Sequence, residues 1–238
     1  MAKLSLIFPM AGQGARFGYR FKPFLNIQGQ PFIAAAFEPF RPWLAEIDKI
    51  YFVITRAQED AHGVRARLAT LFAGLPWQAV ILEAPTDGPA ETLSQCLVQT
   101  GIEGAVIVCD CDHAVEVGGL MGLASARPDV ACAMPTWALD GEKLTAWSVA
   151  AIDKAGRILA IKEKALPENG DHFRGVIGCY YFANIAQASE TIAQDGLLYI
   201  SDIVARVIAS GASVISIPVT QAKFFGDPER VARLSADH

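Results

Sequence analysis

The sequence predicts an α/β fold: a Rossmann-like mixed, mostly parallel sheet flanked by helices. Several apolar runs lack the alternation of inward and outward side chains, which is typical of strands covered on both faces. In the first half these runs alternate with helical segments, and that order predicts parallel strands joined by right-handed crossovers. The 238 residues are 52% hydrophobic and 19% charged, which suits a well-packed globular chain that needs no disulfide or metal cross-links to fold.

The first half has a regular strand–helix rhythm. The apolar run at 3–10 is the first expected strand, and it leads into a glycine-rich loop. The elements that follow are expected at 31–45 (helix), 50–55 (strand), 57–74 (helix), 78–83 (strand), 89–100 (helix) and 105–109 (strand). Four strands alternating with helices indicate a nucleotide-binding type of sheet.

The second half is more antiparallel. Strand-like segments follow one another closely, and the turn residues at 153–157 predict a hairpin between two of them. The elements are expected at 130–134, 146–152, 157–163 and 175–183 (strands), near 184–194 and 200–210 (helices), at 213–219 (strand) and from 228 (helix). No repeat, low-complexity tract or linker divides the chain, so residues 1–238 are expected to form one domain.

Composition excludes several classes of protein. The net charge of −5 argues against a nucleic-acid binder, which needs a basic surface. No apolar run reaches the roughly 18 residues that a membrane span requires. The first apolar run ends at Pro9 and enters a polar loop, so it is interpreted as a strand rather than a signal peptide. The five cysteines show no CxxC pattern, and a cytoplasmic location is expected.

The loop after the first strand is rich in glycine and positive charge. Gly12 and Gly14 fit the start of a dinucleotide fingerprint, but Phe17 stands where the third glycine is needed. A P-loop fails on spacing, because no glycine directly precedes Lys22. Glycines at the carboxyl end of a first strand, with Arg16 and Lys22 beside them, still favour an anionic ligand. The alternative is an ordinary glycine turn with solvated cations.

The same loop resembles the signature of the sugar-phosphate nucleotidyltransferases. The resemblance rests on the sequence Pro-Met-Ala-Gly-x-Gly-x-Arg-Phe at 9–17, Lys-Pro-Phe at 22–24 and Gly-x-Pro-Phe-Ile at 29–33. It implies the nucleotide-diphospho-sugar transferase (GT-A-like) fold. It also implies that Ala11 and Gly12 contact the nucleobase, that Gly14 and Arg16 hold the triphosphate, and that Lys22 neutralises charge between the nucleotide and the acceptor phosphate.

A second block at 84–92, Ala-Pro-Thr-Asp-Gly-Pro-Ala-Glu-Thr, resembles the family segment that lines the base pocket. The resemblance assigns nucleotide binding to Thr86, Gly88, Pro89 and Ala90. On physical grounds Pro89 suits the first turn of a helix, whose unpaired N–H groups favour an anion or a carbonyl. Without the resemblance the block is a plain helix start.

The fourth strand ends in Asp110 and Asp112. Two carboxylates after an apolar strand are costly unless they are paired or bind a metal, and oxygen ligands suit Mg²⁺. By resemblance Asp112 holds the magnesium ion, and Asp110 is spaced like the first aspartate of a DxD element. The alternative is a pair of turn-forming aspartates. His113 is interpreted as a hydrogen-bonding neighbour of the metal site rather than a ligand.

Two later segments resemble the acceptor side of the family. Glu163 and Lys164 resemble its Glu-Lys pair, and Gly178 lies in a strand resembling Gly-x-Tyr-x-Phe, whose glycine lets the acceptor approach the backbone. A solvated charge cluster and an aromatic core strand are the plainer interpretations. One position departs from the family, because Phe224 stands where a second metal-binding aspartate is expected. Either Asp227 or Asp110 is the second metal ligand instead, one protein carboxylate suffices, or catalysis is compromised. The plainer interpretation of Asp227 is the cap of the last helix.

Together these residues predict a magnesium-dependent nucleotidyltransferase that transfers a nucleoside monophosphate from an NTP to a sugar phosphate or similar phosphorylated acceptor, releasing pyrophosphate. Residues 1–115 are the expected nucleotide-binding half and 116–238 the acceptor-binding half. The chain lacks the left-handed helix extension of some relatives and resembles in size the short cytidylyltransferase and capsule-type branches of the family, which implies CTP or UTP. No nucleic-acid or membrane partner is expected, and homo-oligomer formation stays open. The alternatives are a GT-A glycosyltransferase that uses a nucleotide-sugar and a non-catalytic nucleotide- or metabolite-binding relative.

Overall fold

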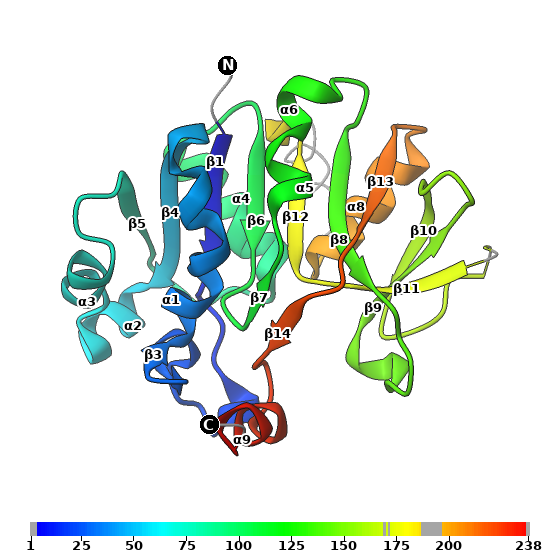
Figure 1. Ribbon diagram of the computed structural model, residues 1–238. Coiled ribbons are helices and arrows are strands. Elements are labelled where there is room, and N and C mark those ends of the chain that lie inside the picture. The colour runs from blue at the N-terminus through cyan, green and yellow to red at the C-terminus, as the bar shows by residue number, and fades with distance from the viewer. Residues whose placement is uncertain (1–3, 169, 171, 187–196, 237–238) are drawn as a thin grey trace.

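One ten-stranded sheet forms the centre of the molecule, and helices cover both of its faces (Figure 1). The computed structural model describes residues 4–168, 170, 172–186 and 197–236. The strand order is β10-β9-β11-β8-β12-β6-β1-β4-β5, with β13 paired to β8. Because this sheet runs through both halves of the sequence, the chain is a single α/β domain, as the sequence predicts.

The N-terminal strands are parallel. β1 (Leu4–Pro9) lies between β4 (Ile47–Thr55) and β6 (Val106–Cys109), and β5 (Trp77–Leu82) pairs with β4. Their carboxyl ends point to the end of the molecule where α9 (Pro228–Ala236) lies (Figure 1). Ligands of open α/β sheets bind outside such strand ends.

The C-terminal strands are mainly antiparallel, so the sheet as a whole is mixed. They are β8 (Cys132–Trp137), β9 (Ser148–Ile152), β10 (Ile158–Glu163), β11 (His172–Val176), β12 (Cys179–Phe182) and β13 (Val214–Pro218). β12 joins the two halves, because it is antiparallel to both β6 and β8. β13 is the exception, since it runs parallel to β8.

Two hydrophobic cores fill the two faces of the sheet. Residues of β1 pack into both cores, Phe8 into one and Ile7 into the other, which explains why the strand is apolar apart from Ser5. The first core is covered by α1 (Phe32–Phe37), α3 (Val64–Leu71) and α5 (Gly118–Met121). The second is covered by α4 (Pro89–Thr100) and α8 (Ile200–Ala209).

Three expected elements are interrupted. The helix expected at 31–45 is α1 followed by a 3₁₀ segment at Glu38–Glu46, because prolines within that segment cannot supply α-helical hydrogen bonds. The helix expected at 57–74 is divided into α2 (Arg56–His62) and α3 by Gly63, whose φ is 56°. The single strand expected at 175–183 is two strands, β11 and β12, which pair with opposite edges of β8.

The structure also contains short elements that the sequence pattern does not reveal. They are the ladder of β7 (His113–Val115) with β14 (Ala222–Phe224), the hairpin of β2 (Asn26–Ile27) with β3 (Gln30–Pro31), and the short helices α5 and α6 (Leu123–Ala126). The helix expected near 184–194 falls largely outside the described residues. Among the helices that are described, none combines the length and apolar character that crossing a bilayer requires.

Candidate active site

A cavity of about 770 Å³ lies at the carboxyl ends of the parallel strands. All but one of the residues predicted for the site line it. Those lining residues are Ala11, Gly12, Gly14, Arg16, Lys22, Thr86, Gly88, Pro89, Asp110, Asp112, Glu163, Lys164, Gly178 and Asp227. Ala90 is the exception, because it is fully buried and its N–H donates to the carbonyl of Leu198. It therefore supports the shape of the segment rather than lining the cavity.

The glycine-rich loop folds into a tight turn between β1 and Lys22. Gly14 has a φ of 67°, and a Cβ at this position would overlap the carbonyl oxygen of Arg20. Its carbonyl accepts hydrogen bonds from the N–H groups of Phe17 and Tyr19. Phe17 packs edge-on against Phe32 at 5.7 Å, so the position that a dinucleotide fingerprint gives to glycine is here a hydrophobic anchor of the loop.

The Lys22 ammonium lies 2.8 Å from an oxygen of Asp112. Burial on its own lowers the pKa of Lys22, but Asp112, with smaller contributions from Cys111 and Asp110, outweighs burial and raises that pKa above its usual value. Burial favours protonation of Asp112 too, but Lys22 and His113 hold its pKa well below the ordinary range. Burial and the charge of Asp112 raise the pKa of Asp110 to about 6. The pKa of Asp112 therefore lies below the ordinary value and that of Asp110 above it, although only one residue separates them.

Asp110, Asp112 and His113 form a cluster that can hold a metal ion. Each offers one ligand atom, and these atoms lie within 4.8 Å of one another. His113 is buried, with Nδ1 3.5 Å from Asp112 and Nε2 3.7 Å from the sulfur of Cys109. Two carboxylates facing a cavity are a donor set that fits a hard divalent cation. His113 lines the cavity as well and belongs to this cluster, whereas the sequence suggests a hydrogen-bonding neighbour of the metal site.

The segment at 84–92 leads into α4 beside the second half of the chain. Thr86 and Thr92 share a hydrogen bond of 2.6 Å between their hydroxyls, which fixes the turn before the helix. A Cβ at Gly88 would overlap the carbonyl oxygen of Leu198, so the two segments touch through the backbone. The predicted base-binding segment is thus positioned by Leu198, which lies 110 positions after Gly88 in the sequence.

The acceptor-side residues are held by their neighbours. One oxygen of Glu163 accepts hydrogen bonds from the hydroxyls of Ser148 and Ser201. Lys164 has a φ of 56°, a strained conformation for a residue with a side chain, and its ammonium lies 3.3 Å from the hydroxyl of Tyr199. Strain of this kind concentrates at functional sites.

The C-terminal segment closes the cavity next to Asp112. The N–H of Phe225 donates to the carbonyl of Asp112, and a Cβ on Gly226 would lie 2.7 Å from its carboxylate. Phe224 packs on two tryptophans and brings no carboxylate to this position. Asp227 accepts from the N–H of Arg230 at 2.9 Å and pairs with its guanidinium at 3.0 Å, which favours the capping role over a metal role.

Sequence reasoning missed several residues that line the same cavity. They are Trp147, Ser148, Tyr180, Tyr199 and Arg230. Asp227 and Arg230 are three positions apart at a helix start, and this spacing could have indicated their ion pair from the sequence. The others come together only through the fold.

Gly178→Ala provides a first test of this geometry. The N–H of Asp110 donates to the carbonyl of Gly178, and a Cβ at residue 178 would overlap the Asp110 carboxylate. The displaced carboxylate is expected to lower kcat by about 10²-fold. Gly122→Ala is the matched control, because nothing lies near the added methyl group there. The kcat and the melting temperature of both variants are measured. An unchanged kcat in Gly178→Ala would contradict the importance of the Asp110 carboxylate position.

An α/β sheet whose strand ends bring a glycine loop, a lysine and paired carboxylates into one cavity defines a protein that handles nucleoside phosphates. The profile of the MobA-like NTP transferase domain matches residues 7–169, which is more than half of the chain. The chain therefore belongs to this family and is a nucleotidyltransferase, as the loop signature predicts. None of the curated proteins matches the sequence significantly.

Solved structures share the whole fold at low sequence identity. A nucleoside-diphosphate-sugar pyrophosphorylase from Vibrio cholerae RC9 is 20% identical with a TM-score of 0.78, covering 96% of this chain and 98% of its own. A UDP-glucose pyrophosphorylase complexed with UDP-glucose is 16% identical with a TM-score of 0.79, covering 99% and 98%. The inositol-1-phosphate CTP transferase from T. maritima is 12% identical with a TM-score of 0.71, covering 99% and 97%. These similarities confirm the fold.

Proposed function

We propose that the protein transfers a nucleoside monophosphate from an NTP, with CTP or UTP favoured, to a sugar phosphate or similar phosphorylated acceptor. The observation that carries the proposal is the Lys22–Asp112 ion pair. It joins the glycine loop to the carboxylate cluster inside a cavity that also contains Glu163 and Lys164. The solved structures of similar fold act on UDP-glucose and on inositol-1-phosphate with CTP by their names, which supports a phosphorylated small acceptor.

In the proposed reaction an oxygen of the acceptor phosphate attacks the α-phosphorus of the NTP. A new P–O bond forms, the bond from the α-phosphorus to the bridging oxygen breaks, and the electron pair leaves with pyrophosphate. The acceptor oxygen is already ionised, so the site needs no strong base and works by positioning and electrostatic stabilisation. The loop N–H groups and Arg16 hold the triphosphate, and Lys22 reduces repulsion between the two anions.

We assign Mg²⁺ to Asp112 and Asp110, whose oxygens face the cavity. The ion would supply neutralisation of phosphate charge. Asp227 is the remaining candidate ligand, although both of its oxygens contact Arg230. Glu163, Lys164 and Gly178 are assigned to the acceptor, and residues 1–115 and 116–238 to the nucleotide and acceptor halves. The C-terminal segment returns to the nucleotide half through β14 and β7, so Asp112 lies where the halves meet.

A substrate screen tests the function. The four common NTPs are incubated with pooled sugar phosphates and Mg²⁺, and pyrophosphate is measured. We expect pyrophosphate release that requires both an NTP and an acceptor, strongest with CTP or UTP. Omitting the acceptor is the control for simple hydrolysis. Transfer from a nucleotide-sugar without pyrophosphate would support the glycosyltransferase alternative, and tight NTP binding without turnover would support the non-catalytic one.

A further inference from the structure

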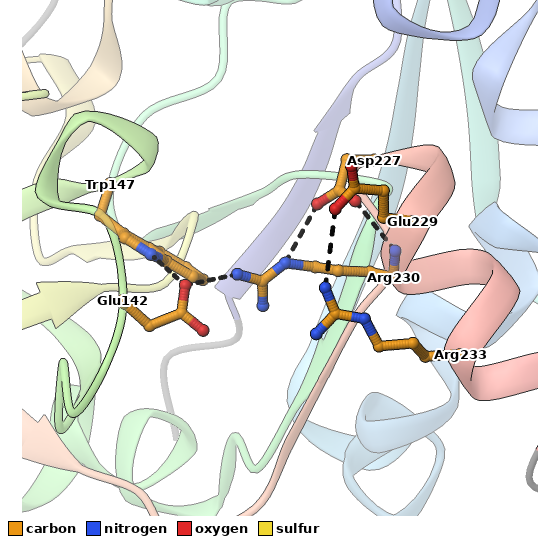
Figure 2. A network of polar contacts seen from close by, with 6 residues as sticks. All are labelled: Glu142, Trp147, Asp227, Glu229, Arg230 and Arg233. Carbon is orange, nitrogen blue, oxygen red and sulfur yellow. Dashed lines mark hydrogen bonds and ion pairs between the residues drawn. The ribbon is translucent and has the colours of Figure 1, made fainter.

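Arg230 on α9 is held by two carboxylates from different parts of the chain. Its Nη2 lies 2.6 Å from Glu142 and its Nε lies 3.0 Å from Asp227, so the planar guanidinium is fixed at two corners (Figure 2). The side chain is 23% exposed, against 25% for Glu142. Charge-assisted contacts with this partial burial are stronger than those of an exposed surface pair.

Two aromatic rings hold the same guanidinium. Its centre lies 5.1 Å from the ring of Trp147 and 5.4 Å from the ring of Phe224, and these rings contact each other at 4.8 Å. The indole N–H of Trp147 donates to the Glu142 oxygen that Arg230 binds (Figure 2). Arg230 therefore joins the segment at 142–147 to the C-terminal segment, and Trp147, Phe224 and Arg230 all line the cavity.

Each of the two joined segments leads to a part of the proposed site. The carbonyl of Trp147 accepts a hydrogen bond of 2.8 Å from the N–H of Lys164, the strained residue on the acceptor side. Phe225, next to Phe224, donates its N–H to the carbonyl of Asp112 at 2.9 Å. Arg230 therefore connects the segment that contacts Lys164 with the segment that contacts Asp112.

The same helix contains a contrasting pair. Arg233 lies 3.6 Å from Glu229, but the two side chains are 76% and 86% exposed (Figure 2). Neither Arg233 nor Glu229 lines the cavity. Exposed pairs of this kind contribute little to structure, so Arg230 and Arg233 differ in surroundings while sharing helix, charge and chemistry.

We propose that Arg230 is a positioning residue for the acceptor: it holds Trp147 and Glu142 against Phe224 and Asp227 so that the acceptor phosphate faces the α-phosphate of the NTP. This inference rests on the proposed nucleotidyl transfer. Arg230 acts by connecting the segment with Glu142 and Trp147 to the C-terminal segment. The atoms between which the new bond forms belong to the two substrates.

Kinetics of Arg230→Ala, Arg230→Lys and Arg233→Ala test the proposal. In Arg230→Ala, the acceptor kcat/KM is expected to fall about 10–100-fold, while the KM for the NTP changes less than about 2-fold. Arg230→Lys is expected to recover only part of the loss, because an ammonium cannot bond both carboxylates in the planar arrangement of a guanidinium. Arg233→Ala is expected to match the wild type.

Hydrogen exchange supplies a second readout that needs no turnover. Amide exchange in 139–147 and 228–236 is expected to rise together in Arg230→Ala and to stay at the wild-type rate in Arg233→Ala. Equal rises in both KM values, or unchanged exchange at 139–147, would overturn the proposal by indicating a general or a purely local role.

Failure of the proposed function can be distinguished from failure of the Arg230 proposal. A wild-type protein that releases no pyrophosphate with any acceptor would overturn the proposed function, and with it the acceptor role of Arg230. An active wild type with an unchanged acceptor kcat/KM in Arg230→Ala would overturn the Arg230 proposal alone.

Discussion

Lys22→Ala is expected to lower kcat/KM for nucleotidyl transfer by about 10²–10³-fold, the loss typical of removing one charge-stabilising group from an active site. The Lys22 ammonium lies 2.8 Å from Asp112, at the point where the glycine loop meets the carboxylate cluster. An incoming acceptor phosphate and an NTP would repel each other there, and Lys22 supplies positive charge between them. Arg16, Lys164 and Arg230 line the same cavity, but it is Lys22 that lies against Asp112.

Titration of Lys22 itself is not expected to change this loss across neutral pH. Although burial opposes the charge, Asp112 raises the pKa of Lys22 above its ordinary value of 10.5. A raised pKa means that the stabilisation from the charged form is fully present below 10.5 and is lost only as the pH rises through the higher folded value. Between about pH 6 and 9 the Lys22 ammonium therefore stays charged, so a change in the ratio of wild-type to variant activity near pH 6 would come from Asp110, whose pKa Lys22 also lowers.

The fold should survive this change. Lys22 and Asp112 are 28% and 19% exposed, so water can reach the carboxylate that loses its partner. We expect a cost of about 1–3 kcal/mol, between the values for exposed and buried pairs. Arg20→Ala removes an exposed charge from the same loop and is the control. A Lys22→Ala enzyme with more than half of the wild-type kcat/KM would contradict the role of Lys22.

The N-terminal half of the fold was predictable because its signals are local. β1, β4, β5 and β6 are short apolar runs between helical segments, and all four occur within a few residues of the expected bounds. The interrupted helices carry their causes in the sequence as well, since Pro42 lies inside the 3₁₀ segment and Gly63 lies between α2 and α3. Periodicity does not predict the pairing of β7 with β14, because these strands are about a hundred residues apart in the sequence.

The candidate site divides in the same way. The glycine loop and the segment at 108–113 are contiguous, so the resemblance could place Arg16, Lys22 and Asp112 directly, and all three line the cavity. Arg230 and Glu142 are 88 residues apart, and nothing in either neighbourhood signals the other. Ala90 was assigned by its motif, yet its burial gives it a supporting place. Motifs thus identify site residues that lie together in one loop. Cavity residues from segments far apart in the sequence can be identified only from the folded structure.

Asp112→Asn is expected to remove nearly all activity, by about 10³-fold, because one substitution takes away both the partner of Lys22 and a proposed metal ligand. Lys22 and His113 outweigh the effect of burial and keep the pKa of Asp112 well below its ordinary 3.8. The stabilisation from this carboxylate is therefore present above pH 3.8 and lost only as the pH falls through the lower folded value. At neutral pH the wild-type residue is an anion, and asparagine replaces it with a neutral group of the same shape.

Shape matters here because Gly226 leaves little room beside the Asp112 carboxylate. Asparagine fits that space, so a small change in melting temperature with a large loss of kcat would separate chemistry from folding. Calorimetry with Mg²⁺, and with Mn²⁺ as a probe, is expected to show weaker metal binding in Asp112→Asn than in wild type. Asp129→Asn, which changes an exposed aspartate paired with Arg127, serves as the control for loss of one negative charge. If Asp112→Asn kept both metal binding and transfer, the roles proposed for Asp112 in holding the metal and in catalysis would be contradicted.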